Sequence, residues 1–230
     1  MLFRSPVKGL CPVGCSYCYA RRMYKRFGWN PEIREDISAY DGLQKMRAGS
    51  KVFVGSTMEL FGHWVTPLMR SNLFHVIEMY PKLTFIFLTK QPQNLPHEFP
   101  DNCWVGISAS DACDLTTRGT DLEHVWAKIK FVSLEPLLGW SSYDTGYEAG
   151  WMERRGINWL IIGQQTPPKA TTQPKVEWIS EIITAADKAK IPVFLKNNLK
   201  NLLPAEYPFV TNPLRDMDFY LRQEYPRKES

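Results

Sequence analysis

The chain has 230 residues, enough for one sizeable α/β domain with a hydrophobic core, and 44% of its residues are hydrophobic. No run of about 18 apolar residues occurs, and residues 1–6 lack the apolar core of a secretory signal, so we expect no membrane partner. The net charge of +4 permits an anionic partner such as nucleic acid without requiring one. Five cysteines, three of them crowded together, argue against a disulfide framework and predict a cytoplasmic location.

Short apolar runs along the chain predict strands that are covered on both faces. A weaker run, Ser5–Leu10, precedes the crowded cysteines and would form the first strand. The six runs that follow are Lys51–Gly55, Thr84–Leu88, Trp104–Ile107, Phe131–Leu134, Trp159–Ile162 and Pro192–Leu195. Near-continuous apolar character over four or five residues is typical of parallel strands.

Helix start signals lie between these runs. Thr66 followed by Pro67 predicts an N-cap with proline in the first turn. Residues 120–123, Thr-Asp-Leu-Glu, have the spacing of a capping box and predict a helix that continues through Ile129. Pro174 opens the clearest amphipathic helix. Strands that alternate with helices predict βα units and a parallel sheet.

These elements predict an α/β fold, namely a partial (β/α) barrel of about six or seven parallel strands, related to the TIM barrel. An open doubly wound sheet is the competing architecture. Residues 1–203 would form the barrel, with a metal-binding loop at 11–18, and residues 204–230 would be a C-terminal tail packed on it. Residues 140–156 read as a long loop or lid.

Polar residues follow nearly every predicted strand. In a βα barrel the active site lies at the carboxyl ends of the strands, so these residues would share one mouth. The alternative is that strands simply end where polarity begins. The set comprises Ser56, Thr57, Glu59, Thr89, Lys90, Ser108, Ser110, Asp111, Glu135, Gln164, Gln165, Lys196 and Asn197.

Cys11, Cys15 and Cys18 stand together after the first apolar run, and their thiolates predict a metal centre. Structural zinc takes four ligands, usually as two separated pairs, and this group supplies three. A disulfide would leave one thiol over and conflict with a reducing compartment. An iron–sulfur cluster fits better, because thiolates on short spacings are its usual ligands. A non-catalytic zinc or iron–sulfur module remains the alternative.

The spacing Cys-x3-Cys-x2-Cys, with Tyr17 before the last cysteine, resembles the motif of the radical S-adenosylmethionine (radical SAM) superfamily. The chain further resembles a family within it that was first annotated from phage genes without assigned function. The matching stretches are 15–21, 54–61, 87–92, 105–108, 131–138 and 192–196. One departure is Gly163-Gln164-Gln165, where that family tends to have Gly-Gly-Glu.

The resemblance implies a mechanism and a set of site residues. A 4Fe–4S cluster would be held by Cys11, Cys15 and Cys18, and its open iron would bind S-adenosylmethionine. An electron donor such as flavodoxin or ferredoxin would reduce the cluster, and a 5′-deoxyadenosyl radical would abstract hydrogen from an unknown substrate. By strand order, Gly55, Ser56 and Thr57 would contact the methionyl amino group. Ser108 and Glu135 would lie near the ribose or methionine end, and Tyr17 near the adenine.

A basic stretch follows the cysteines directly. Its cations, Arg21, Arg22, Lys25 and Arg26, are interleaved with Tyr19, Tyr24, Phe27 and Trp29. Stacking combined with phosphate contact would use such residues, so a nucleic-acid partner is one hypothesis. The other is an amphipathic helix with its aromatic side chains buried and its charges in water.

Overall fold

The computed structural model describes residues 2–141, 149–203, 210–211 and 220–226. The chain divides into two compact units. The first consists of residues 1–106 and 124–128, and the second of residues 107–123 and 129–230. Within the described ranges no helix is both long and apolar enough to cross a bilayer.

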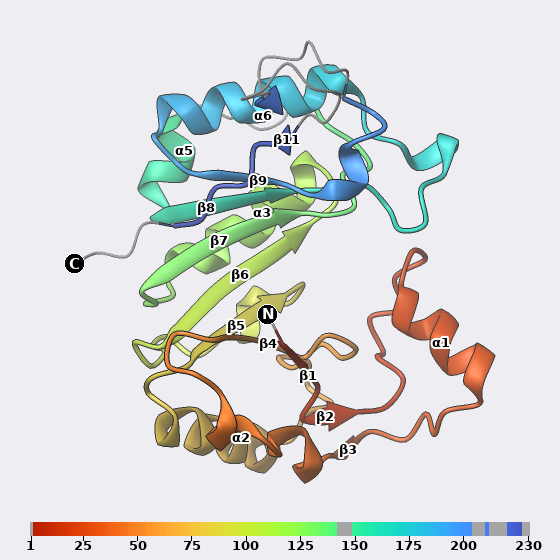
Figure 1. The fold of residues 1–230 in the computed structure, drawn as a ribbon, viewed down its shortest axis with the longest axis vertical. Coiled ribbons are helices and arrows are strands. Elements are labelled where there is room, and N and C mark those ends of the chain that lie inside the picture. Colours follow the sequence, from red (N-terminus) through yellow and green to blue (C-terminus); the bar gives the residue numbers. More distant parts are fainter. Residues whose placement is uncertain (1, 142–148, 204–209, 212–219, 227–230) are drawn as a thin grey trace. The chain divides into compact units, whose positions relative to one another are not determined.

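The main sheet has seven strands, and their order in the sheet is their order along the chain (Figure 1). They are β1 (Leu2–Arg4), β4 (Lys51–Val54), β5 (Thr84–Thr89), β6 (Cys103–Ala109), β7 (Ile129–Leu134), β8 (Ile157–Ile162) and β9 (Val193–Leu195). The pairs β1–β4 and β4–β5 of the first unit and β7–β8 and β8–β9 of the second are parallel. The α/β class and the parallel sheet are therefore confirmed, and sequential order is consistent with a partial (β/α) barrel.

The first unit adds two helices and a small ribbon to its strands. Its helices are α1 (Tyr19–Phe27) and α2 (Pro67–Met79), and β2 (Val7–Lys8) pairs antiparallel with β3 (Arg34–Glu35). Short 3-10 turns cover 37–40, 43–45 and 92–94. Phe61, Phe87 and Phe99 form an aromatic core with ring centroids 5.8 to 6.0 Å apart. Thr66 caps α2 as predicted, since its hydroxyl accepts from the Met69 N–H at 3.2 Å.

The second unit contains α3 (Ala112–Glu123), α5 (Ala149–Arg154) and α6 (Val176–Lys188). Short 3-10 turns cover 170–172 and 197–199, and β10 (Val210–Thr211) pairs antiparallel with β11 (Tyr220–Leu221). The predicted helix after Pro174 is confirmed as α6, whose buried side chains are Ile179, Ile182, Ile183, Ala185 and Ala186. The backbone after β11 hydrogen-bonds β9: Leu195 N–H donates to the Arg222 carbonyl at 2.8 Å.

Two predicted elements are wrong. The first strand of the sheet is Leu2–Arg4, whereas the run Ser5–Leu10 turns away and forms β2 of the antiparallel ribbon. The supposed capping box at 120–123 ends α3 rather than starting a helix, and Ile129 begins β7.

Two predicted segments extend beyond the described residues. In the predicted lid, residues 142–148 lie outside them, and Ala149–Arg154 form a helix rather than a loop. Most of the predicted tail, at 204–209, 212–219 and 227–230, also lies outside the description.

Candidate metal centre

The three clustered cysteines line one pocket. Cys11, Cys15 and Cys18 are free thiols of intermediate exposure. The pocket is a small hollow of about 20 Å³ and is partly open to solvent. Its other lining residues are Leu10, Gly14, Ala20, Arg21, Tyr24 and Thr57, so the lining contains three thiols and no carboxylate or imidazole. The structure thus brings together the cysteines that the spacing singled out.

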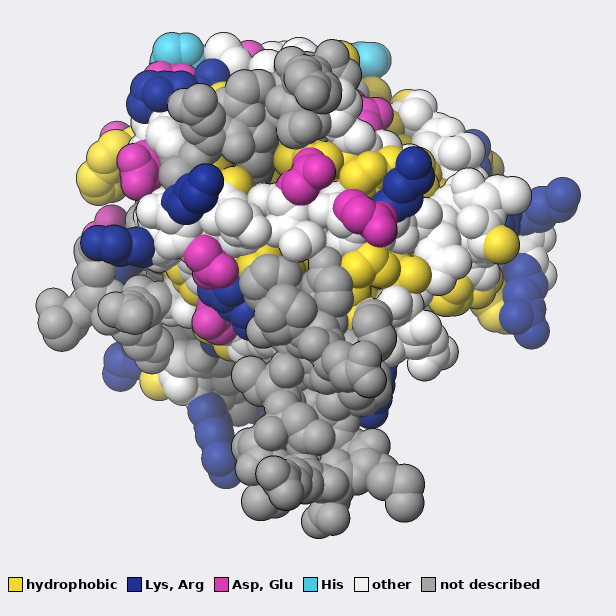
Figure 2. All heavy atoms as spheres, turned by 90° about the horizontal axis from the view of Figure 1, so that it is seen from above, with side chains coloured by type: hydrophobic (Ala, Val, Ile, Leu, Met, Phe, Trp, Pro, Cys, Tyr) yellow, Lys and Arg dark blue, Asp and Glu magenta, His cyan; other side chains and the backbone are white. Residues whose placement is uncertain are grey.

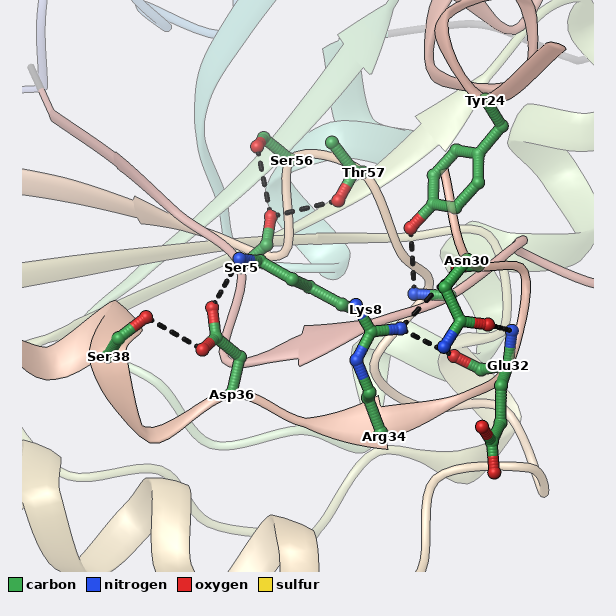
Figure 3. Close-up of polar contacts among 11 residues, drawn as sticks. Ser5, Lys8, Tyr24, Asn30, Glu32, Arg34, Asp36, Ser38, Ser56 and Thr57 are labelled. Carbon is green, nitrogen blue, oxygen red and sulfur yellow. Dashed lines mark hydrogen bonds and ion pairs between the residues drawn. The ribbon is translucent and has the colours of Figure 1, made fainter. Parts of the chain in front are cut away.

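Helix α1 fixes the cysteine loop from its own first turns. Cys18 is the N-cap, and its sulfur accepts from the Arg21 backbone N–H at 3.5 Å. The Arg21 guanidinium donates to the Cys11 carbonyl at 2.7 Å. One turn further, the Tyr24 hydroxyl accepts from the Gly9 N–H at 2.8 Å (Figure 3). Both ends of the loop are therefore tied to one helix.

Burial raises the pKa of the Cys11 thiol above its usual value. The negative charges of Glu59 and of a Cys15 thiolate raise this pKa further, whereas hydrogen bonds from the Glu59 and Val13 backbone lower it. An anionic sulfur at this position is costly without a cation, and a bound metal supplies that cation.

Glu59 is a buried carboxylate next to this thiol. One of its oxygens accepts from the Thr89 hydroxyl at 2.7 Å and from the Phe61 N–H at 3.1 Å. The other accepts from the Lys90 N–H at 2.7 Å. Glu59 therefore ties the loop after β4 to the end of β5 and holds its own backbone N–H against Cys11. Sequence reasoning placed it among the polar strand ends without assigning it a role.

Hydroxyl groups gather at the ends of β1 and β4. The Ser5 and Ser56 hydroxyl oxygens lie 3.2 Å apart, and the Thr57 hydroxyl donates to Ser5 at 3.0 Å (Figure 3). The Ser56 carbonyl accepts from the Tyr19 hydroxyl at 2.6 Å, which joins this loop to α1. Thr57 lines the cysteine pocket. Of Gly55, Ser56 and Thr57, which are predicted to contact the methionyl amino group, the last two thus belong to this hydroxyl cluster, and Thr57 borders the pocket.

Tyr17 lies in the same unit, and its ring faces Lys90, the residue that directly follows β5. The Lys90 ammonium nitrogen is 5.5 Å from the Tyr17 ring centroid, within the range of a cation–π contact. Tyr17 is half-buried and stands between two of the cysteines in sequence. An adenine-facing role for it stays a prediction.

Gly55 begins the turn that carries Ser56 and Thr57. Its φ is +80°, and a Cβ built there would lie 2.7 Å from Leu60 Cδ1. Both the backbone conformation and the close approach require glycine.

We expect Gly55→Ala to lower the free energy of unfolding by about 1–3 kcal/mol, because the positive φ is strained for alanine and Leu60 must shift. Urea denaturation measures this. Gly139→Ala is the control, since a Cβ there meets Asp111 Cβ at an ordinary 3.5 Å. Equal stability of the two variants would contradict the strain argument.

The other predicted contact residues belong to the second unit, which is described by itself. The Ser108 carbonyl accepts from the Arg118 guanidinium, and Ser108 is buried. The Glu135 carboxylate forms an ion pair with Lys196. A Cβ at Gly163 would lie 3.2 Å from the Glu135 side chain.

Gln164 and Gln165, which replace a Gly-Glu pair of the resembled family, are both buried. The Gln164 side-chain amide donates to the Asn198 carbonyl, and the Asn198 amide donates to the Gln164 carbonyl at 2.7 Å. Gln164 therefore ties the loop after β8 to the loop after β9 through a side-chain amide, which the glycine of the resembled family lacks at this position.

The donor set can be tested against the implied cluster. In the described ranges no group of three or more His, Cys, Asp or Glu side chains is arranged so that it could hold a metal ion. The pocket lining nevertheless offers three thiols from one short loop, the donor type that iron–sulfur clusters take. A structural zinc site needs a fourth ligand, and the lining contains none. In composition the residues present fit a cluster with one iron left unligated by the protein.

The fold and the pocket define an α/β protein with a parallel sheet and a three-thiol pocket at the start of α1. The chain belongs to a family described as a protein of unknown function (DUF5131), whose model matches residues 5–201. No curated protein and no solved structure matches the chain.

Proposed function

We propose that the protein is a radical SAM enzyme, in a partial (β/α) barrel of the kind that superfamily uses. The observation that carries the proposal is the pocket whose only metal-ligating side chains are Cys11, Cys15 and Cys18. Three thiolates on a 4Fe–4S cluster leave one iron without a protein ligand, so a small molecule can bind to it. An open coordination position likewise distinguishes catalytic from structural zinc sites.

The chain's own residues would hold the cofactors and shield them. When bound, the reduced cluster would supply the electron that cleaves S-adenosylmethionine to a 5′-deoxyadenosyl radical. Arg21 and Tyr24 anchor the backbone of the cysteine loop, and Glu59 anchors the loop after β4. Thr57 lines the pocket, and because its hydroxyl proton is donated to Ser5, its oxygen is left to accept a hydrogen bond.

The proposal implies partners and a compartment. A one-electron donor such as flavodoxin or ferredoxin would reduce the cluster, and the reducing cytoplasm would keep the thiols free. The Gly55, Ser56 and Thr57 loop is proposed to face the methionyl amino group. Ser108 and Glu135 are proposed to lie near the ribose or methionine end of S-adenosylmethionine, and Tyr17 is proposed to lie near its adenine. The hydrogen donor of the reaction is an unknown substrate.

Thiol alkylation under native, anaerobic conditions tests cluster ligation without requiring turnover. In the metal-free protein, iodoacetamide is expected to modify Cys11, Cys15, Cys18 and the exposed Cys113. Cys103 is expected to stay unmodified, because it is fully buried and burial raises its pKa to about 12.

After reconstitution with iron and sulfide, we expect only Cys113 to react, as read by peptide mass spectrometry. Cys113 therefore serves as the internal control for reagent access. A brown protein whose Cys11, Cys15 and Cys18 still react as in the metal-free form would contradict the ligand assignment.

A further inference from the structure

The exposed face at the end of α1 carries aromatic rings that the proposed cluster chemistry does not use. Of the aromatic residues in and after this helix, Tyr24 is buried. Tyr19, Phe27 and Trp29 are 48%, 54% and 42% exposed. The interpretation of α1 as a helix with all its aromatic side chains buried is therefore wrong for three of the four.

Phe27 and Trp29 form a stacked pair that the helix end holds in place. Their ring centroids are 5.6 Å apart and the planes are inclined by 23°. Gly28 lies between them in a left-handed conformation, with φ of 59°, and its N–H donates to the Tyr24 carbonyl. Trp29 also packs edge-on against Tyr24, at 5.3 Å between centroids. The pair is thus anchored to the same tyrosine that fixes the cysteine loop.

The last turn of α1 also carries two cations. The Arg26 guanidinium lies 5.3 Å from the Phe27 ring centroid, and Lys25 is exposed on the same last turn of α1. The helix contains four basic residues and no acidic one. On much of the face drawn in Figure 2, by contrast, acidic and basic side chains are intermingled.

Cations in the last turn of a helix have an ordinary explanation, since they offset the partial negative charge of the helix end. Exposed, stacked aromatic rings have no such explanation, because they leave apolar surface in water. Unpaired bases stack on such rings while cations contact the phosphates, whereas bases within a duplex are already stacked on each other. An acidic protein partner would need the cations but not the rings.

We propose that Lys25, Arg26, Phe27 and Trp29 form a binding surface for single-stranded nucleic acid. At 1.5 Å per helical residue, Phe27 lies about 13 Å along the axis from Cys18, so a bound strand would run close to the cysteine pocket. Binding at this surface stands independently of the proposed radical chemistry.

Fluorescence anisotropy with the full chain and labelled oligo(dT) or oligo(U) tests the proposal, and binding of either supports it. We expect binding that weakens with salt. Phe27→Ala should weaken it about tenfold, with an unchanged salt slope, because it removes stacking alone. Lys25→Glu/Arg26→Glu should weaken it by at least about tenfold and reduce the log–log salt slope by about 1.4.

The matched control is Lys169→Glu/Lys188→Glu, which makes the same charge change at exposed positions of the second unit. This control should bind as the unmodified chain does, and thermal melts should show that all variants are folded. Three results would overturn the proposal: wild-type affinity in Phe27→Ala, equal loss in both charge-reversal variants, or equal affinity for a duplex of the same length. Cluster content is measured separately, so loss of radical chemistry would leave this result unchanged.

Discussion

Alanine in place of Cys15 is expected to abolish reductive cleavage of S-adenosylmethionine, so that release of 5′-deoxyadenosine falls to the level of a protein-free control. Cys15 is the middle member of the three thiols that line the pocket, and nothing else on the lining can replace it. With two thiolates left, a 4Fe–4S cluster loses one of its three protein ligands. Anaerobic reconstitution, followed by dithionite reduction and chromatography of the nucleoside products, measures the effect.

Cys113→Ala is the matched control, because it removes an exposed thiol that lies outside the pocket lining. We expect it to bind iron and to release 5′-deoxyadenosine as the unmodified chain does. If Cys15→Ala retained this activity, the radical SAM proposal would be refuted.

Glu59→Gln is expected to lower the free energy of unfolding by about 2–4 kcal/mol and to reduce iron incorporation as well. The carboxylate accepts three hydrogen bonds in a buried position, from Phe61, Thr89 and Lys90. A glutamine side chain has one acceptor oxygen and a donor amide, so a buried backbone N–H would face another donor. Urea denaturation gives the stability, and iron analysis gives the occupancy.

Two comparisons separate Glu59 from a general effect of removing charge. Glu78→Gln makes the same change on the exposed side of α2 and should leave both readouts unchanged. Thr89→Val removes the hydroxyl that donates to Glu59 and accepts from the Gln91 N–H, and should cost less than Glu59→Gln, about 1–2 kcal/mol. A fully stable Glu59→Gln protein with normal iron content would show that this carboxylate does not position the pocket.

The long apolar runs predicted the parallel strands well, because burial on both faces leaves an uninterrupted apolar pattern. The first strand of the sheet was not predicted, because Leu2–Arg4 is too short to show an apolar pattern. The longer run after it forms the ribbon with β3 instead. Which of two neighbouring short runs joins the sheet depends on strands that are distant in the sequence, and a local apolar pattern does not contain that information.

The misplaced helix start has a specific physical cause. Thr120 does not cap a new helix, because its hydroxyl donates to the Thr116 carbonyl one turn earlier, at 3.1 Å. The true start lies at Asp111, whose carboxylate accepts from the Asp114 N–H at 2.8 Å. The hydroxyl of a threonine within a helix commonly donates to a carbonyl one turn earlier. A capping-box spacing alone therefore does not distinguish a threonine that starts a helix from one inside it.

The candidate site was predictable where the chemistry is local in sequence. Cys11, Cys15 and Cys18 stand within one loop, and their spacing places them at one pocket. Glu59 acquires its role only from Thr89 and Lys90 on another strand, which no spacing shows. The stacking of Phe27 on Trp29 likewise depends on the turn at Gly28, which an amphipathic helical pattern does not contain.

The most direct test of the central claim is iron analysis of anaerobically purified protein, combined with calorimetric titration of S-adenosylmethionine. We predict about four irons per chain and saturable binding of S-adenosylmethionine that is lost with Cys15→Ala. Protein that instead contains one tetrahedral zinc ion, closed by a fourth side chain and without affinity for S-adenosylmethionine, would contradict the account.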